Sequence, residues 1–295
     1  MKNYDLVFIG QLCYDEIIHK DGSSTICTGG AALYGAIAAS VFNRKLAAVI
    51  KCAPESENDL HIFKEHGIDV YTASSPETTH VQVLHKSHNI DEREIITLHN
   101  AGPFTENDIP DISAAHVHLA GCNDHDFDLD FIRSIKKRFA SVSVDMQTFI
   151  RYNDPGTGHI TFGDDPDKKE VLSFMSRGKL DIVEAKLLTG TDTIEEAAKT
   201  VISWGCPEVL ITRSDGAFVM CDNKTYFEIF SNKSSEGRTG RGDTTFGTYL
   251  ACRIAMDIER SLQYAAALVS IKMENPGPFA GTKNDVEDRI RSASS

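Results

Sequence analysis

The sequence predicts an α/β fold in which a doubly wound, mostly parallel sheet is flanked by helices and carries a small β lid. Short apolar runs alternate with helix-length amphipathic segments, as in parallel α/β sheets. Residues 79–99 instead alternate polar and apolar side chains without a helical period, which is typical of antiparallel strands with one wet face. We therefore expect one domain, 1–295, with lid strands contributed by about 13–28 and 79–99.

The elements follow in order along the chain. Residues 4–10 form an apolar run that ends in glycine and predicts a buried parallel strand. Residues 13–28 predict two short strands around the turn Asp21-Gly22, and a small-residue helix follows at 28–40. Further strands are expected at 46–52, 116–121, 141–145, 180–185 and 208–212, an antiparallel pair at 217–221 and 225–230, and helices at about 56–66, 127–138, 193–204, 242–256 and 258–273.

Composition and charge limit the possible partners. The net charge of -13 argues against a nucleic acid or an anionic membrane as partner, because both need a basic face. The first apolar run is too short for a signal peptide or a membrane span. Seven scattered cysteines without a C-x-x-C pair indicate reduced thiols, so we expect a cytoplasmic protein.

The stretch 236–254 carries the strongest functional signal. Its three glycines directly precede an amphipathic helix: Gly237, Gly240 and Gly242. The first turn of a helix leaves N–H groups unpaired and carries a partial positive charge, so an anion such as phosphate is expected there. Arg238 and Arg241 add two guanidinium groups to the same loop.

Asp243 places a carboxylate in the first turn of that helix. A base beside a phosphate site indicates phosphoryl transfer, in which a group must accept the proton of the attacking hydroxyl. The alternative interpretation is an ordinary loop whose aspartate complements the helix dipole. No G-x-x-x-x-G-K-[ST] motif occurs and no G-x-G-x-x-G follows the first strand, which argues against a P-loop ATPase and a dinucleotide dehydrogenase.

Asp181 and Glu184 are spaced D-x-x-E at the end of a predicted strand. Carboxylates at such a place could hold magnesium or its waters, and a solvated strand end explains them equally well. Residues 124–130 (DHDFDLD) resemble the start of a calcium loop, but Leu129 and Ile135 stand where glycine and glutamate are needed. An acidic helix start is the better interpretation of that segment.

In this order along nearly the whole chain, these motifs resemble the ribokinase (PfkB) family of carbohydrate kinases. Gly240-Arg241-Gly242-Asp243 is similar to the G-A-G-D signature of the family. The resemblance implies a ribokinase-like fold, Asp243 as the catalytic base, and an anion hole formed by the amides of Gly240, Arg241 and Gly242. Asp145-Met146-Gln147 with Arg151 is similar to the D-P-N-x-R run.

The resemblance also implies further site residues, with ATP and Mg²⁺ as cofactors. The implied substrate-binding residues are Asp15, Gly29, Gly30, Tyr34, Asn123 and Arg238. The implied nucleotide-binding residues are Lys186, Thr212, Arg213, Ser214, Gly216 and Asn275. The implied metal residues are Glu184 and Asp181, which stand for the N-x-x-E element.

Departures from the family pattern bear on the monovalent cation and on the choice of substrate. Gly237 and Arg238 stand where many members have an aspartate and a threonine, and that aspartate helps to bind a monovalent cation. Our hypothesis is that a guanidinium supplies the missing positive charge, so activity should not depend on potassium. Tyr34 replaces an asparagine that commonly touches sugar, a change large enough to alter substrate choice.

The predicted function is transfer of the γ-phosphoryl group of ATP to a hydroxyl of a sugar or cyclitol. The EGRTGRGD and SIKMENPGP segments resemble a compact subgroup with inositol-kinase-like members. One alternative is a nucleoside or vitamin kinase of the same fold, and another is a sugar-binding regulator without turnover. We expect a small-molecule partner, and a homodimer could form through an open lid edge.

Overall fold

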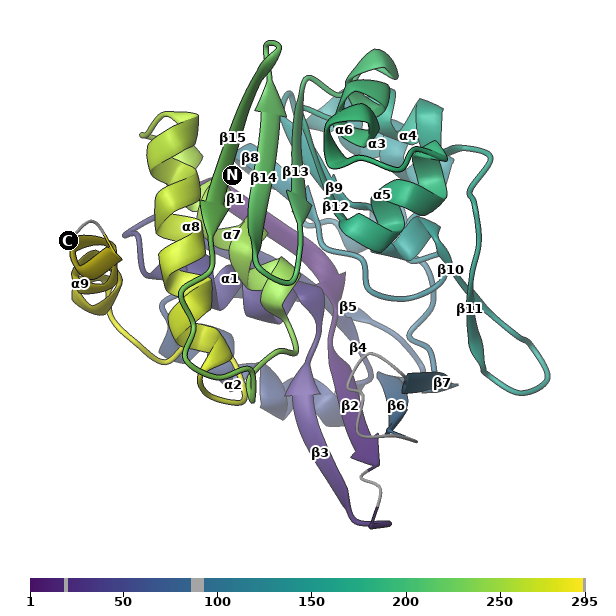
Figure 1. Ribbon diagram of the computed structural model, residues 1–295. Helices are drawn as coiled ribbons and strands as arrows, with labels where there is room; N and C mark the ends of the chain where they lie inside the picture. Colours follow the sequence, from purple (N-terminus) through teal and green to yellow (C-terminus); the bar gives the residue numbers. More distant parts are fainter. Residues whose placement is uncertain (19–20, 86–92, 294–295) are drawn as a thin grey trace.

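The main sheet runs through the centre of the molecule, as a computed structural model shows (Figure 1). The structure describes residues 1–18, 21–85 and 93–293. Within them, nine strands pair in the order β15-β14-β13-β12-β9-β8-β1-β4-β5. Their bounds are β1 Lys2–Gln11, β4 Leu46–Cys52, β5 Asp69–Ser74, β8 Ile112–Leu119, β9 Val142–Asp145, β12 Arg177–Asp181, β13 Glu208–Thr212, β14 Gly216–Cys221 and β15 Lys224–Ile229.

Helices cover both faces of this sheet (Figure 1). One face carries α1 Ala31–Ser40, α2 His61–Glu65, α7 Arg241–Arg253, α8 Ile258–Met273 and α9 Lys283–Ala293, and the other carries α3 Leu129–Arg138, α5 Ile182–Thr189 and α6 Ile194–Ser203, with the short α4 Lys168–Ser173 beside them. Successive strand residues alternate between the two cores, so Phe8 packs in one while Val7 and Ile9 pack in the other. The predicted doubly wound fold is confirmed.

The strand order reverses at β1. The chain leaves β1 for β4 and β5 on one side and then returns to β8 on the other, and β1 pairs in parallel with both neighbours. In open α/β sheets, ligands bind outside the carboxyl ends of strands at such a switch point. The topology therefore predicts a ligand site at the segments that follow β1, β8, β9, β12 and β13.

A separate four-stranded sheet stands off the carboxyl ends of the main sheet and forms the lid (Figure 1). Its order is β3-β2-β6-β7, with β2 Cys13–Ile18, β3 Ser24–Gly29, β6 Thr79–His85 and β7 Arg93–His99. The two predicted antiparallel pairs occur, and a parallel β2–β6 pairing joins them. Residues 19–20 and 86–92 of the predicted lid segments lie outside the described residues.

Three parts of the sequence prediction need correction. The strand expected at 180–185 ends at Asp181, because α5 begins at Ile182. The helix expected at 56–66 consists of the 3₁₀ helix η1 Pro54–Leu60 followed by α2. The hairpin β10 Arg151–Asn153 and β11 Ile160–Phe162, together with α4 and α9, was not predicted.

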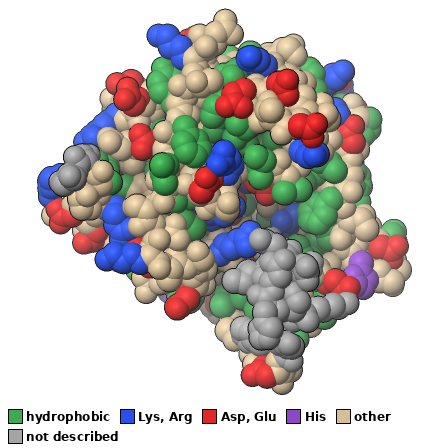
Figure 2. Space-filling view, in the orientation of Figure 1, with side chains coloured by type: hydrophobic (Ala, Val, Ile, Leu, Met, Phe, Trp, Pro, Cys, Tyr) green, Lys and Arg blue, Asp and Glu red, His purple; other side chains and the backbone are tan. Residues whose placement is uncertain are grey.

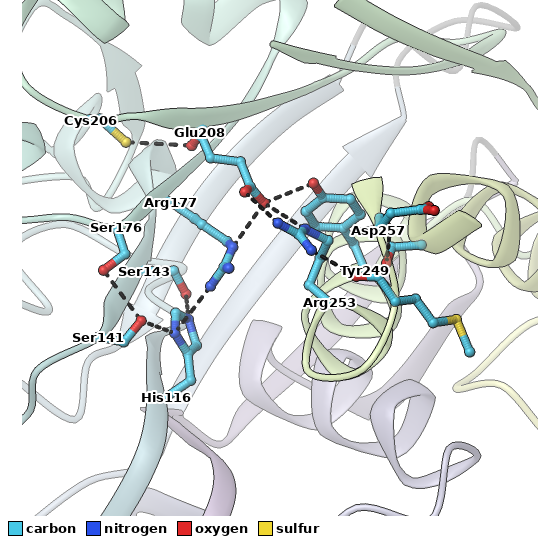
Figure 3. Close-up of polar contacts among 12 residues, drawn as sticks. His116, Ser141, Ser143, Ser176, Arg177, Cys206, Glu208, Tyr249, Arg253 and Asp257 are labelled. Carbon is cyan, nitrogen blue, oxygen red and sulfur yellow. Dashed lines mark hydrogen bonds and ion pairs between the residues drawn. The ribbon is translucent and has the colours of Figure 1, made fainter. Parts of the chain in front are cut away.

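Helix α7 is fixed to the sheet at its C-terminal end. Glu208, buried at the start of β13, accepts hydrogen bonds from Arg177 Nε at 2.8 Å, Tyr249 Oη at 2.8 Å and Arg253 Nη2 at 3.1 Å (Figure 3). Burial by itself would raise the pKa of Glu208, but Arg253, Arg177 and Tyr249 together hold that pKa below its ordinary value. A charge-assisted network thus joins the last turn of α7 to β12 and β13.

Helices α1 and α7 cross at two glycines. A Cβ atom added to Gly247 would lie 2.3 Å from the carbonyl oxygen of Gly35, so only glycine allows this approach. The contact brings the first turn of α7 close to α1, since a Cβ on Gly35 would lie 3.4 Å from the carbonyl oxygen of Asp243. The position of Asp243 is therefore set by two contacts of α7: the Glu208 network at its C-terminal end and the glycine contact with α1.

Candidate active site

A cleft of about 600 Å³ lies between the carboxyl ends of the main sheet and the lid. The lid contributes mainly apolar side chains, while the strand ends, the loop before α7 and the start of α7 contribute polar ones. Figure 2 shows this face hollowed at its middle, with Lys and Arg side chains at the edge of the hollow. Residues that follow β1, β8 and β9, or that lie in the last part of β12 and β13, thus share one cavity with the glycine-rich loop.

The loop closes on the cleft at Gly240, the N-cap of α7. Gly240 has a φ of 76°, and a Cβ there would lie 2.4 Å from the Tyr34 ring, so glycine is required on both grounds. The amide of Arg241 donates to Arg238 O at 3.1 Å. The next amides, of Gly242 and Asp243, belong to the first turn, where a helix offers N–H groups to an anion.

Asp243 lines the cleft beside these amides. Burial, opposed by Lys179 and Arg151 and assisted by the nearby Asp145, raises the pKa of its carboxyl to about 6. A carboxylate with this pKa is largely ionised near neutral pH and is a stronger base than an exposed aspartate. Its environment suits proton abstraction from a hydroxyl.

Lys179 is a buried cation at the centre of the site, and the sequence analysis did not single it out. Its ammonium lies 2.9 Å from Asp145 Oδ2 and 4.0 Å from Glu184 Oε2, and a Cβ on Gly242 would lie 2.9 Å from it. Although burial opposes ionisation, Asp145, Glu184 and Asp243 raise the pKa of Lys179. The available signal was a lysine directly before an apolar run that predicts a buried strand, since a buried lysine is rare without a charged partner.

The predicted substrate-binding residues gather mostly at the lid end. Asp15, Gly30, Tyr34 and Arg238 line the cleft. Gly29 lies behind Asp15, because a Cβ there would be 2.6 Å from Asp15 Oδ2. The Tyr34 ring is buried between this end and Gly240, and burial raises the pKa of its hydroxyl.

Asn123 lies behind the cleft wall. It is 1% exposed, and its amide nitrogen in the backbone donates to Asp126 Oδ2 at 3.0 Å. Its side-chain Nδ2 is buried without a hydrogen-bond partner among the described residues. The neighbouring Cys122 reaches the cleft instead, and Arg151 donates to the Cys122 carbonyl at 2.7 Å.

Most of the predicted nucleotide-binding residues lie away from the cleft. Of that set, Thr212 alone is among the described residues that line it. Arg213 is paired with Asp215 at 2.5 Å and stacks on Phe227, and Lys186 is paired with Asp192 at 2.8 Å on the surface. Ser214 lies in the turn before β14, Gly216 is packed against Glu228 O, and Asn275 is exposed beyond α8.

Asp181 and Glu184 form a capping box at the start of α5. Asp181 Oδ1 accepts the amides of Val183 and Glu184, both at 2.8 Å, and Glu184 Oε2 accepts the amide of Asp181 at 2.6 Å. Burial raises the pKa of Glu184, and the Lys179 ammonium already lies among these carboxylates. The pair does not fit direct magnesium ligation well, and no group of three or more potential metal ligands occurs within the described ranges.

Comparisons with known proteins support this picture. No family model matches the chain. The sulfate-complex structure of a pyrophosphate-dependent kinase in the ribokinase family is 31% identical, with a TM-score of 0.88 over 96% of this chain and 99% of that chain. The structure of such a kinase complexed with a pyrophosphate analog and myo-inositol is also 31% identical, with a TM-score of 0.86 over the same shares. A cytidine kinase of Thermococcus kodakarensis is 24% identical over 263 residues, 84% of this chain and 87% of that protein.

The fold and the cleft define a kinase that phosphorylates a hydroxyl group of a small molecule. With a relative of 31% identity aligned over almost its full length, the chain belongs to the ribokinase family. The resemblance stated from the sequence is therefore confirmed. Among the described helices, none combines the length and apolarity that crossing a bilayer requires.

Proposed function

We propose that this kinase transfers a phosphoryl group from pyrophosphate to a hydroxyl of a cyclitol such as myo-inositol. The observation that carries the proposal is the cluster of cations in one cleft with Asp243. Four cationic side chains line it: Arg151, Lys179, Arg238 and Arg241. A protein with a net charge of -13 holds a highly charged anion only where local positive groups gather.

The donor is the point at which this proposal departs from the expectation of ATP. The relatives of 31% identity are described as pyrophosphate-dependent. Arg213 and Lys186, which were expected to hold a nucleotide, are engaged with Asp215 and Asp192 outside the cleft. A donor without adenosine needs neither residue, and ATP remains the second candidate because Thr212 does line the cleft.

The acceptor pocket suits a polyol ring. Asp15 offers carboxylate oxygens to hydroxyl groups, while Ile17, Val83 and Ile95 of the lid present apolar surface to the C–H face of a ring. One of the similar structures was solved with myo-inositol. A nucleoside is the rival acceptor, supported by the similarity to a cytidine kinase.

The transfer step uses groups on both sides of the reacting phosphorus. Asp243 accepts the proton of the acceptor hydroxyl as its oxygen bonds to phosphorus, and the bridging P–O bond of the donor breaks to release inorganic phosphate. The amides of Gly240 and Gly242 stabilise the charge on the transferred group, and Lys179 balances charge behind them. The Arg241 amide, which was expected in the anion hole, donates to Arg238 O instead. A magnesium ion carried by the donor would further neutralise the charge of its phosphates.

The test supplies the magnesium salts of pyrophosphate and ATP with myo-inositol, other cyclitols, sugars and cytidine, and follows phosphate esters by ³¹P NMR. We expect an inositol phosphate with pyrophosphate. The Asp243→Asn variant should lose at least about 100-fold in kcat, while Asp285→Asn, which also removes a first-turn carboxylate but on α9, should not. Absence of any ester with the folded native protein would favour a binding regulator, and unchanged turnover in Asp243→Asn would remove the mechanism.

A further inference from the structure

A buried lysine lies beneath the glycine-rich loop. Lys272, near the end of α8, is 3% exposed, and its ammonium donates to the carbonyl oxygens of Gly237 and Thr239. It also lies 4.9 Å from the centre of the Tyr34 ring. The ammonium is thus held by two backbone carbonyls and an aromatic face, an arrangement that a cation stabilises and a neutral group does not.

These two hydrogen bonds fix the direction of the loop amides. In a planar trans peptide, the C=O and the following N–H point in opposite directions, and the described backbone has no cis bond. Because the carbonyls of Gly237 and Thr239 point to Lys272, the amides of Arg238 and Gly240 point away from it. Both of those residues line the cleft, so the lysine turns amides toward the proposed phosphate site.

The loop is also pressed against the end of α8. The amide of Gly237 donates to Met273 O at 2.8 Å, and a Cβ on Gly237 would lie 1.8 Å from Asn275 O. Carbonyl groups at a helix C-terminus carry a partial negative charge, which adds to that of the two loop carbonyls. A positive charge at this place offsets repulsion that would otherwise push the loop off the helix.

We propose that Lys272 is a positioning residue, a tethered cation that holds the phosphate loop in its working shape and makes a free monovalent cation unnecessary. This inference rests on the proposed function for its kinetic consequences. It replaces the hypothesis that a guanidinium supplies the missing charge, because an ammonium from α8 contacts the loop carbonyls. Burial lowers the pKa of Lys272 to about 8, with Asp243 opposing, so the ammonium form predominates at neutral pH.

The kinetic test compares Lys272→Met with Lys51→Met. Lys51 is a matched control, since it is also buried and also donates to a backbone carbonyl, Pro103 O at 2.6 Å. Its partners Pro103 and Asp108 lie outside the glycine-rich loop. Lys272→Met should lower kcat roughly 100-fold with a smaller effect on the acceptor KM, whereas Lys51→Met should keep kcat. In Lys272→Ala, which leaves space, potassium or ammonium chloride should restore part of kcat and tetramethylammonium chloride should not.

Two further measurements test the role of Lys272 even if a Lys272 variant is unstable or the true acceptor is not a cyclitol. The native protein should turn over equally in potassium and in tetramethylammonium salts, and strong activation by potassium would overturn the inference. Hydrogen–deuterium exchange needs no turnover: Lys272→Met should speed exchange in a peptide that covers 237–243, and Lys51→Met should not. If Lys272→Met leaves exchange in the 237–243 peptide unchanged, or keeps kcat, Lys272 has no positioning role. If the native protein shows no turnover, that result counts against the proposed function alone.

Discussion

A single methyl group at Gly237 tests how closely the phosphate loop must be placed. In Gly237→Ala the added Cβ would lie 1.8 Å from Asn275 O and 2.7 Å from Lys272 O, against a lower limit of 3.0 Å for real contacts. Both obstacles are backbone atoms, so the loop has to move away by about 1 Å. A misplacement of this size near reacting groups costs on the order of 100-fold in rate, or about 2.7 kcal/mol.

The assay measures kcat with pyrophosphate and the best acceptor, together with the free energy of unfolding in urea. We expect a loss of about 100-fold in kcat and of ~1–3 kcal/mol in stability. Gly67→Ala serves as the control, because Gly67 has a φ of 70° with open space around it and lies outside the cleft. It should cost about 1 kcal/mol in stability and leave kcat alone. A Gly237→Ala enzyme that keeps kcat within about threefold would refute the reasoning from loop geometry.

Four more results are expected. Glu208→Ala should lower the free energy of unfolding by about 3–5 kcal/mol, measured in urea, because it leaves two arginines without their buried carboxylate; a loss below about 1 kcal/mol would contradict this. The pH profile of kcat/KM should fall below about pH 6 as Asp243 takes up a proton and above about pH 8 as Lys272 loses one, and a flat profile from pH 5 to 9 would contradict both roles. Asp15→Ala should raise the acceptor KM roughly 10- to 100-fold in steady-state assays with little change in Tm, whereas an unchanged KM would move the acceptor elsewhere. Arg241→Ala should raise the KM for pyrophosphate by a similar factor, and no change would remove it from the donor site.

The sequence predicted most of the fold because its signals were local. Apolar runs and the glycine loop marked the strands and α7, and the alternation at 79–99 marked the lid. The error at 180–185 arose because the apolar residues on both sides of Asp181 were taken as one strand. The capping box of Asp181 and Glu184, which marks the start of α5, was interpreted as a metal motif. Periodicity alone does not separate a strand end from a buried helix start.

The candidate site was predicted less completely, since it depends on contacts between distant segments. The motif placed Asp243 and its loop at the cleft, but no spacing rule links Lys179 or Lys272 to it. Lys179 directly precedes an apolar run and Lys272 lies within one, and the sequence does not say which charge or carbonyl each one meets. For Arg213 the sequence could not show that its guanidinium pairs with Asp215 in the same turn, outside the cleft.

The glycine crossing of α1 and α7 and the network around Glu208 have a joint mechanical consequence. They join Asp243, the proposed proton acceptor, and the loop amides to the main sheet through close helix packing and a buried ion pair. The apolar side of the cleft, in contrast, is built largely from the small separate sheet. Under the proposed function, substitutions in that sheet can therefore change the acceptor specificity while the phosphoryl-transfer residues stay in place.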